Sequence, residues 1–170
     1  MFIIVEGPKC VGKTTLCNTL SKKFNMPIIH FPTNSKLGKR AYEMMSIPGK
    51  YNEAQELMEQ DIDNTLSQIE ENCILDRSFI SNAIYRNDEH IIIKDKYMKI
   101  LEKSMLIVLL ASTENIYKWI KLRTDKPLTQ VEQSKIEWSN ERFHKLSDIL
   151  ECKPLGEREI KQGYWYIERD

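Results

Sequence analysis

The stretch that decides the fold is Phe2-Ile3-Ile4-Val5, followed by Gly7-Pro8-Lys9-Cys10-Val11-Gly12-Lys13-Thr14. The four apolar residues are typical of a buried strand, and residues 15–20 can continue the chain as a helix. The octet fits the pattern G-x-x-x-x-G-K-[ST], which requires a strand before it and a helix after it. The stretch therefore predicts a loop whose backbone N–H groups hold the phosphates of a nucleotide.

Each side chain of this loop has a predicted place around the nucleotide. The Lys13 ammonium would reach the outer phosphates, and the Thr14 hydroxyl would bind Mg²⁺. The predicted nucleotide-binding residues are Gly7, Pro8, Lys9, Cys10, Val11, Gly12, Lys13, Thr14 and Thr15.

Length and composition limit the other possibilities. The 170 residues indicate a single domain, 1–170, with a sizeable core. Lys+Arg and Asp+Glu are equal at 25 each, which argues against broad binding to nucleic acid or to an anionic membrane. The longest apolar run, 105–111, is too short to span a bilayer, and no basic segment of a signal peptide precedes the first strand. The cysteines show no spacing typical of a metal site or a disulfide framework, and the histidines are expected to be structural, so we expect reduced thiols and a cytoplasmic location.

Apolar strands alternate with amphipathic helices along the chain. Besides the first strand, strands are expected at 26–30, 73–75, 105–110 and 163–167. Helices are expected from residue 15 to about 24 and at 36–46, 53–70, 78–85, 91–103, 113–122 and 129–150, the last opened by a Thr129–Glu132 capping box. This alternation predicts an α/β fold of three layers, in which a parallel sheet of roughly five strands is flanked by helices.

Polar residues follow the predicted strands. The residues at these ends are Gly7, His30, Asp76 and Ser112. Ligands of open parallel sheets bind at the carboxyl ends of the strands, so these positions are expected along one edge. The Asp76 carboxylate can act with Thr14 at a magnesium ion, and the Arg77 guanidinium can clamp an anionic acceptor or a migrating phosphoryl group.

Taken together, these pieces resemble the thymidylate kinase branch of the P-loop nucleoside and nucleotide kinases. The matching segments are Val5-Glu6-Gly7, Phe31-Pro32 with Ser35 and Leu37-Gly38-Lys39, Leu75-Asp76-Arg77, Ser81-Asn82-Ala83-Ile84-Tyr85, and a basic lid at Arg123. The resemblance covers residues 1 to about 150. It implies a three-layer P-loop kinase fold, ATP as phosphoryl donor, Mg²⁺, a deoxynucleoside monophosphate (dTMP first) as acceptor, and often a homodimer.

The resemblance also implies roles for particular residues. Arg77 would hold the acceptor phosphate and the transition-state charge, and Arg123, in a lid segment at 122–129, would close over the transferring group. The implied catalytic residues are Lys13, Arg77, Asp76, Arg123 and Glu6, and the implied metal ligands are Thr14 and Asp76. The implied substrate-binding residues are Phe31, Pro32, Asn34, Arg77, Phe79 and Tyr85, with Tyr42 as a further candidate for the base pocket.

The chain departs from the family pattern at three places. Lys9 stands where these kinases commonly carry Asp, and Asn34 stands where they commonly carry an arginine that grips the acceptor phosphate. They also place an arginine on the helix before the Asp-Arg strand, whereas no arginine lies between Ala41 and Asp76 here. Arg77 is therefore left as the clear phosphate-gripping arginine.

Three alternatives stay open. Deoxynucleoside kinases share the fold, and Glu6 would then take the proton from a 5′-hydroxyl acceptor. The missing arginines leave room for a non-catalytic nucleotide-binding module. A kinase acting on a modified nucleotide or on a nucleic-acid end is the third alternative, and the neutral net charge argues against the nucleic-acid form.

Replacing Lys13 tests the loop assignment. We expect Lys13→Ala to lose several kcal/mol of transition-state stabilisation, because an electrostatic clamp on a transferring phosphoryl group acts most strongly in the transition state. The measurement is kcat/KM with ATP and Mg²⁺. Full turnover by Lys13→Ala would show that the loop assignment is wrong.

Overall fold

One parallel sheet organises the computed structural model, which describes residues 1–69, 72–86, 88–155 and 163–169. Its six strands within these residues are β1 (Phe2–Glu6), β2 (Ile28–His30), β3 (Cys73–Asp76), β4 (Met105–Ala111), β5 (Lys153–Pro154) and β6 (Gly163–Arg169). Their order across the sheet is β2-β3-β1-β4-β6-β5. The two-residue strand β5 makes the sheet one strand wider than the five that the sequence predicts.

Helices connect the strands and cover both faces of the sheet. They are α1 (Lys13–Phe24), α2 (Lys36–Met44), α3 (Tyr51–Gln68), α4 (Phe79–Tyr85), α5 (Asp95–Leu101), α6 (Thr113–Thr124) and α7 (Gln130–Ile149). The helix expected at 91–103 is shorter than predicted. The expected end at Glu70 and the last residue of the expected domain, Asp170, lie outside the described residues. The predicted α/β fold, with helices on both faces of a parallel sheet, is confirmed.

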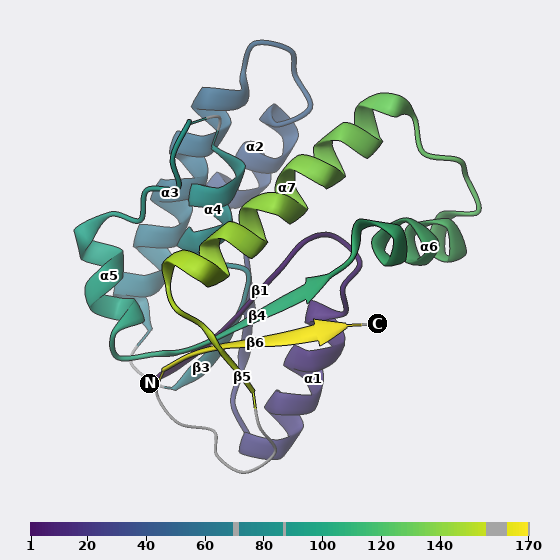
Figure 1. The fold of residues 1–170 in the computed structure, drawn as a ribbon. Helices are drawn as coiled ribbons and strands as arrows, with labels where there is room; N and C mark the ends of the chain where they lie inside the picture. Colours follow the sequence, from purple (N-terminus) through teal and green to yellow (C-terminus); the bar gives the residue numbers. More distant parts are fainter. Residues whose placement is uncertain (70–71, 87, 156–162, 170) are drawn as a thin grey trace.

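Strand side chains alternate between two cores. On β1, Ile3 and Val5 belong to the core under α1 and α6, and Ile4 belongs to the core under α2, α3, α4, α5 and α7. Successive side chains of a strand point to opposite faces, so a strand covered on both sides must be apolar throughout. Figure 1 shows this division, with α1 on one side of the sheet and α3, α4, α5 and α7 on the other.

Hydroxyl side chains cap the N-terminal ends of α2, α4, α6 and α7. Ser78 accepts a hydrogen bond from the Ile80 N–H at the start of α4, and Ser112 accepts one from Asn115 at the start of α6. The predicted capping box at Thr129 and Glu132 is confirmed, with both of its hydrogen bonds present. Such caps satisfy N–H groups that the helix itself leaves unpaired, and so they set where each helix begins.

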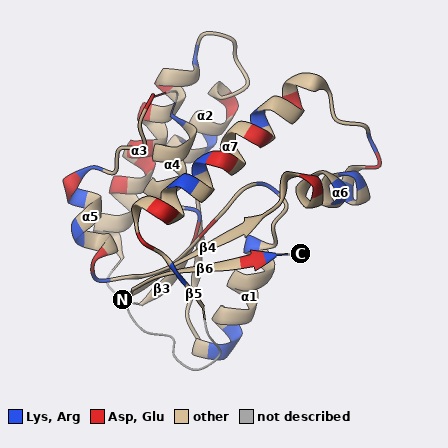
Figure 2. Cartoon of the chain, viewed as in Figure 1, with Lys and Arg blue, Asp and Glu red and all other residues tan. Residues whose placement is uncertain are grey.

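Charged residues of both signs are mixed along the helices, as Figure 2 shows for α7. This mixing agrees with the formal net charge of zero. Over the residues that the structure describes, no helix combines the length and the apolar character needed to cross a bilayer.

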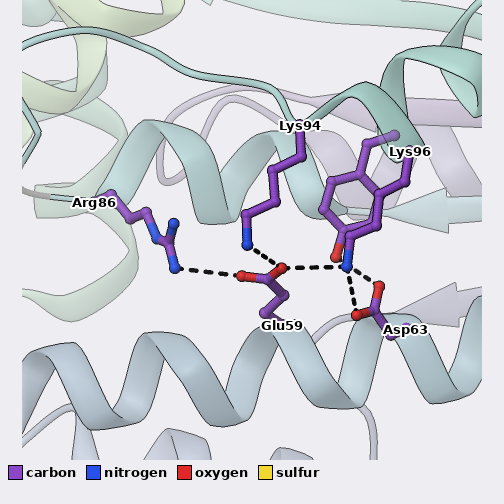
Figure 3. Close-up of polar contacts among 6 residues, drawn as sticks. Glu59, Asp63, Arg86, Lys94 and Lys96 are labelled. Atoms are coloured by element: carbon purple, nitrogen blue, oxygen red, sulfur yellow. Dashed lines mark hydrogen bonds and ion pairs between the residues drawn. The ribbon is translucent and has the colours of Figure 1, made fainter.

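A cluster of ion pairs ties α3 to the end of α4 and the start of α5 (Figure 3). The Glu59 carboxylate, 13% exposed, meets Arg86 Nη2 at 3.3 Å, Lys96 Nζ at 3.2 Å and also Lys94. Lys96 Nζ lies 2.6 Å from Asp63 as well. Burial alone would raise the pKa of Glu59, but the hydrogen bonds and charges of Lys94 and Lys96 outweigh it and lower the pKa.

Glu59→Gln is expected to lower the free energy of unfolding by about 1 kcal/mol at neutral pH, because the partners are partly screened by solvent. The folded pKa lies below the unfolded one, so this contribution is complete above the ordinary glutamate pKa and is lost as the pH falls through the folded value. Urea unfolding of both proteins over this range should therefore show the difference shrink in acid.

The matched control is Glu114→Gln on α6. Glu114 pairs with Lys118 at 2.9 Å, but both side chains are exposed to solvent, so no measurable change is expected. If Glu114→Gln lowered the free energy of unfolding as much as Glu59→Gln, the ion pairs around Glu59 would contribute no more than an exposed pair.

Candidate active site

The loop at residues 7–12 joins β1 to α1 with positive φ angles that favour glycine at Gly7 and Gly12. Gly7 has φ 144°, and a Cβ placed there would lie 2.5 Å from the Leu109 carbonyl oxygen of β4. Gly12 has φ 91° and stands at the N-cap of α1, where no side chain caps the helix. The N–H groups of the first turn can therefore meet an anion, which the positive end of the helix dipole also favours.

Lys13 lies folded back onto the loop. Its ammonium donates to the Gly7 carbonyl oxygen at 2.9 Å and to the Pro8 carbonyl oxygen. Burial and the charge of Arg77 lower the pKa of Lys13 to about 7, against the opposing effect of Glu6 and Asp76. A bound phosphate would favour the charged form, because it adds a negative charge close to the ammonium.

Asp76, the last residue of β3, brings Thr14 and His30 together. Thr14 Oγ1 donates to Asp76 Oδ2 at 2.9 Å, and His30 Nδ1 lies 3.0 Å from the same oxygen. His30 was expected to be only structural, but the end of β2 runs beside the end of β3 and so places it in the site. A hydroxyl and a carboxylate are oxygen ligands of the kind that Mg²⁺ prefers, so Thr14 and Asp76 fit the predicted metal.

Within the described ranges, no group of three or more His, Cys, Asp or Glu side chains could hold a metal ion. Mg²⁺ at a phosphoryl-transfer site does not need such a group. One or two protein oxygens hold it there, and substrate phosphates and water complete its octahedral shell.

Arg77 lies in the left-handed region with φ 70°, which is uncommon for a residue other than glycine. Its backbone N–H donates to the Val5 carbonyl oxygen at 3.1 Å. Its guanidinium donates to Ser81 Oγ at 3.2 Å and stacks 5.6 Å from the centre of the Tyr85 ring. Burial disfavours the charged form, but Tyr85, Glu6 and Asp76 outweigh burial and raise the pKa of Arg77.

Glu6 is fully buried behind Arg77. Its carboxylate accepts hydrogen bonds from Ser78 Oγ at 2.8 Å, from Ser81 Oγ at 2.6 Å and from the Ser81 N–H at 3.3 Å. Burial raises the pKa of Glu6, and these hydrogen bonds oppose the rise. Because Ser81 Oγ accepts from Arg77 and donates to Glu6, the three residues form a chain from β1 to the guanidinium.

Two cavities meet at Phe31 and Arg77. The loop cavity, about 580 Å³, is lined by the residues Lys9, Cys10, Gly12, Lys13, Thr14, Thr15, His30, Asp76, Trp119, Leu122 and Arg123 besides the two shared ones. The helix cavity, about 1110 Å³, lies between α2, α3, α4 and the first half of α7. Glu6 lines neither cavity, and its role as a base toward a substrate hydroxyl stays a prediction.

The loop cavity gathers most of the residues predicted to bind the donor nucleotide. Gly7, Pro8 and Val11 do not line it and instead shape the loop from behind. Arg123 does line it, and its Nη1 lies 3.8 Å from Cys10 Sγ. The predicted lid segment 122–129 contains the break between α6 and α7.

The helix cavity gathers only part of the predicted substrate set. Phe31, Pro32, Arg77, Tyr85 and Tyr42 line it. Asn34 is exposed and lines neither cavity.

Phe79 is a correction to the predicted base pocket. It is buried in the core and stacks on Tyr97 with the ring centres 4.5 Å apart. Helical spacing explains the difference, because Ser78, Ser81, Asn82 and Tyr85 share the face of α4 that borders the cavity and Phe79 lies off it.

Several residues of the helix cavity were missed. The missed residues include Gln55 on α3, Asn82 on α4 and Trp138 on α7. The spacing of Ser81, Asn82 and Tyr85 on one predicted helix was a usable signal for Asn82. No local pattern predicts Gln55 or Trp138 as a site residue. Each lines the cavity only because α3 and α7 lie on opposite sides of it in the folded chain.

Comparison with known proteins agrees with this fold. Residues 3–139 match the AAA domain family, and the chain therefore belongs to that family. No curated protein matches the chain.

Solved structures share the fold over nearly the full chain. They include the YorR protein of Bacillus subtilis in complex with phosphorylated GDP (21% identity, 100% of this chain and 85% of that chain, TM-score 0.61). Deoxyadenosine kinase from M. mycoides, with dCMP and dCDP bound, matches at 17% identity over 100% and 90%, TM-score 0.66. Thymidylate kinase from Candida albicans matches at 18% identity over 98% and 82%, TM-score 0.65. The chain thus has the α/β P-loop kinase fold, and the thymidylate kinase branch stays a prediction.

A double-mutant cycle tests the chain of hydrogen bonds behind Arg77. In Glu6→Gln, the amide N–H₂ group replaces the carboxylate oxygen that accepts the hydrogen bond of the Ser81 hydroxyl. Ser81→Ala removes that hydroxyl. Because the two residues bond directly, we expect a coupling free energy of about 1 kcal/mol or more in urea unfolding.

The control cycle pairs Glu6→Gln with Ser139→Ala. Ser139 is a buried serine on α7 whose hydroxyl donates to Ile136 within its own helix. These two changes should add. Additivity in the Glu6–Ser81 cycle as well would contradict the proposed link.

Proposed function

We propose that the chain catalyses ATP- and Mg²⁺-dependent phosphoryl transfer to the 5′-phosphate of a deoxynucleoside monophosphate. The observation that carries this proposal is the junction of the two cavities at Arg77. One cavity contains the phosphate-binding loop and the other is a large pocket with aromatic walls, so a donor and an acceptor could meet at one guanidinium. Phosphoryl transfer depends mainly on such positioning and charge stabilisation.

The donor side follows from the loop. The loop N–H groups and Lys13 would hold the ATP phosphates, and Thr14 and Asp76 would hold Mg²⁺, which neutralises charge on the phosphates when bound. We further propose that 122–129 acts as a lid, with Arg123 reaching the transferring group. The position of Arg123 beside Cys10 of the loop supports this role.

The acceptor side favours a phosphate over a hydroxyl. None of the described residues that line the helix cavity is an aspartate, a glutamate or a histidine, whereas Arg77 and Lys135 are cationic. A monophosphate is already ionised and needs a clamp, whereas a hydroxyl needs a general base. dTMP is the acceptor that the family resemblance predicts, and the choice of base depends on the other residues of the helix cavity.

Deoxynucleoside kinase is the second candidate. Among the described residues, the lining of the helix cavity contains a single arginine, and a deoxyadenosine kinase shares the fold. In this candidate Glu6, which accepts a hydrogen bond from Ser81, would be the base, and Asp76 is the carboxylate that lines the loop cavity.

Arg77→Lys separates the two candidates. Lysine keeps the positive charge but loses the two-pronged hydrogen bonding that a phosphate requires, so kcat/KM for monophosphates should fall about 100-fold or more. The assay follows ADP formation from ATP and Mg²⁺ with deoxynucleoside monophosphates and with free deoxynucleosides as acceptors.

Arg40→Lys on α2 is the matched control, because Arg40 is exposed and lies outside both cavities. It should leave every rate unchanged. Phosphorylation of nucleosides but of no monophosphate by the wild-type protein would overturn the first candidate. ATP binding without turnover of any acceptor would indicate a non-catalytic nucleotide-binding module.

A further inference from the structure

Two amide oxygens face the helix cavity without a protein partner. They are Oε1 of Gln55, on α3, and Oδ1 of Asn82, on α4. The two residues are only 3% and 7% exposed, so bulk water has little access to them. A buried carbonyl oxygen left unpaired is costly, and so these two oxygens call for a ligand that donates hydrogen bonds.

Tyr51 decides which end of the Gln55 amide is free. The Tyr51 hydroxyl donates its one proton to the Tyr85 carbonyl oxygen. Burial raises the pKa of Tyr51, and a hydrogen bond from the Gln55 side chain opposes this rise. Gln55 must therefore donate to Tyr51 through its N–H₂ group, because the tyrosine has no second proton to give. The Gln55 oxygen is the end that remains for a ligand.

The remaining walls suit a flat ring. Phe31, Tyr85 and Trp138 line the same cavity. The Trp138 ring is itself held by Arg142, whose guanidinium carbon lies 4.9 Å from the ring centre. Aromatic faces stack on any nucleobase, so they support binding but do not choose between bases. The choice depends on the polar groups of the pocket, among which the two amide oxygens are buried and without a protein partner.

We propose that the acceptor carries a base with an exocyclic amino group, namely adenine, cytosine or guanine, and that Gln55 and Asn82 determine this specificity. The inference rests on the proposed function, because it concerns the acceptor of that same site. The amino groups of adenine and cytosine each offer two N–H donors, and guanine offers donors at N1 and N2. Thymine and uracil offer one ring N–H between two carbonyl oxygens, which would leave one buried amide oxygen unpaired or facing another oxygen.

This base preference differs from the dTMP that the family resemblance predicts. The missing arginine of α3 explains why it can differ. An arginine side chain is only a donor and would meet a carbonyl oxygen of thymine, whereas the free end of Gln55 is only an acceptor. A site that is built to accept hydrogen bonds rejects an analogue that cannot donate them.

The test is a comparison of kcat/KM for dAMP, dCMP, dGMP, dTMP and dUMP with ATP and Mg²⁺. We expect at least one of the first three to exceed both dTMP and dUMP by about tenfold or more, the cost of one unpaired buried acceptor. A preference for dTMP or dUMP, or equal rates for all five, would overturn the inference.

Two variants test the named residues. Gln55→Met and Asn82→Leu each remove one acceptor oxygen and should each reduce the preference by about tenfold. Gln60→Met, at an exposed glutamine of the same helix outside the cavity, should leave the preference unchanged. Thermal melting of each variant shows whether it is folded, and the wild-type ranking stands without the variants.

Free deoxynucleosides with the same five bases keep the two proposals distinguishable. If only nucleosides react, the proposed monophosphate acceptor is wrong, but the base ranking within the nucleoside series still tests Gln55 and Asn82. If nothing reacts, isothermal titration with the ten ligands gives the ranking from Kd. Failure of all ten to bind would overturn the base inference as well.

Discussion

The site depends on the hydrogen bonds that the buried carboxylate of Glu6 accepts. Glu6 stands at the end of β1, one residue before the phosphate-binding loop, and accepts hydrogen bonds from Ser78 and Ser81. Ser81 in turn holds the guanidinium of Arg77. A buried charge is tolerable only when it is hydrogen-bonded and close to opposite charge, so these groups must keep their places together. The donor loop and the residue proposed to clamp the acceptor are thereby parts of one buried network.

The electrostatics of the junction follow from this network. Lys13 and Arg77 bring two positive charges close together, and Glu6 and Asp76 supply two negative ones. Burial lowers the pKa of Lys13 to about 7. A phosphate bound beside Lys13 would raise this pKa and stabilise the charged ammonium. The strained backbone of Arg77, with φ 70°, belongs to the same arrangement, since unusual dihedrals persist where the surroundings over-determine them.

The success of sequence reasoning depended on how local each signal was. The loop, the Thr129 capping box and the Asp76-Arg77 pair depend on neighbours in the chain, and the structure contains each of them where it was expected. Phe79 was misjudged because its role depends on the direction of its side chain. It lies beside the site in sequence, yet the helix turns its side chain into the interior. The position of His30 on the same sheet edge as Asp76 was predicted, but its contact with the Asp76 carboxylate was not.

The sequence by itself determined the parallel sheet, its apolar strands and the phosphate-binding loop, because apolar periodicity and glycine spacing express local backbone preferences. Only the tertiary structure decided the acceptor side. The helix cavity exists because α3, α4 and α7 pack around one space, which brings Gln55, Asn82 and Trp138 together from distant parts of the chain. Which of their polar atoms is left free depends on contacts such as that of Tyr51 with Tyr85, and no local pattern encodes such a contact.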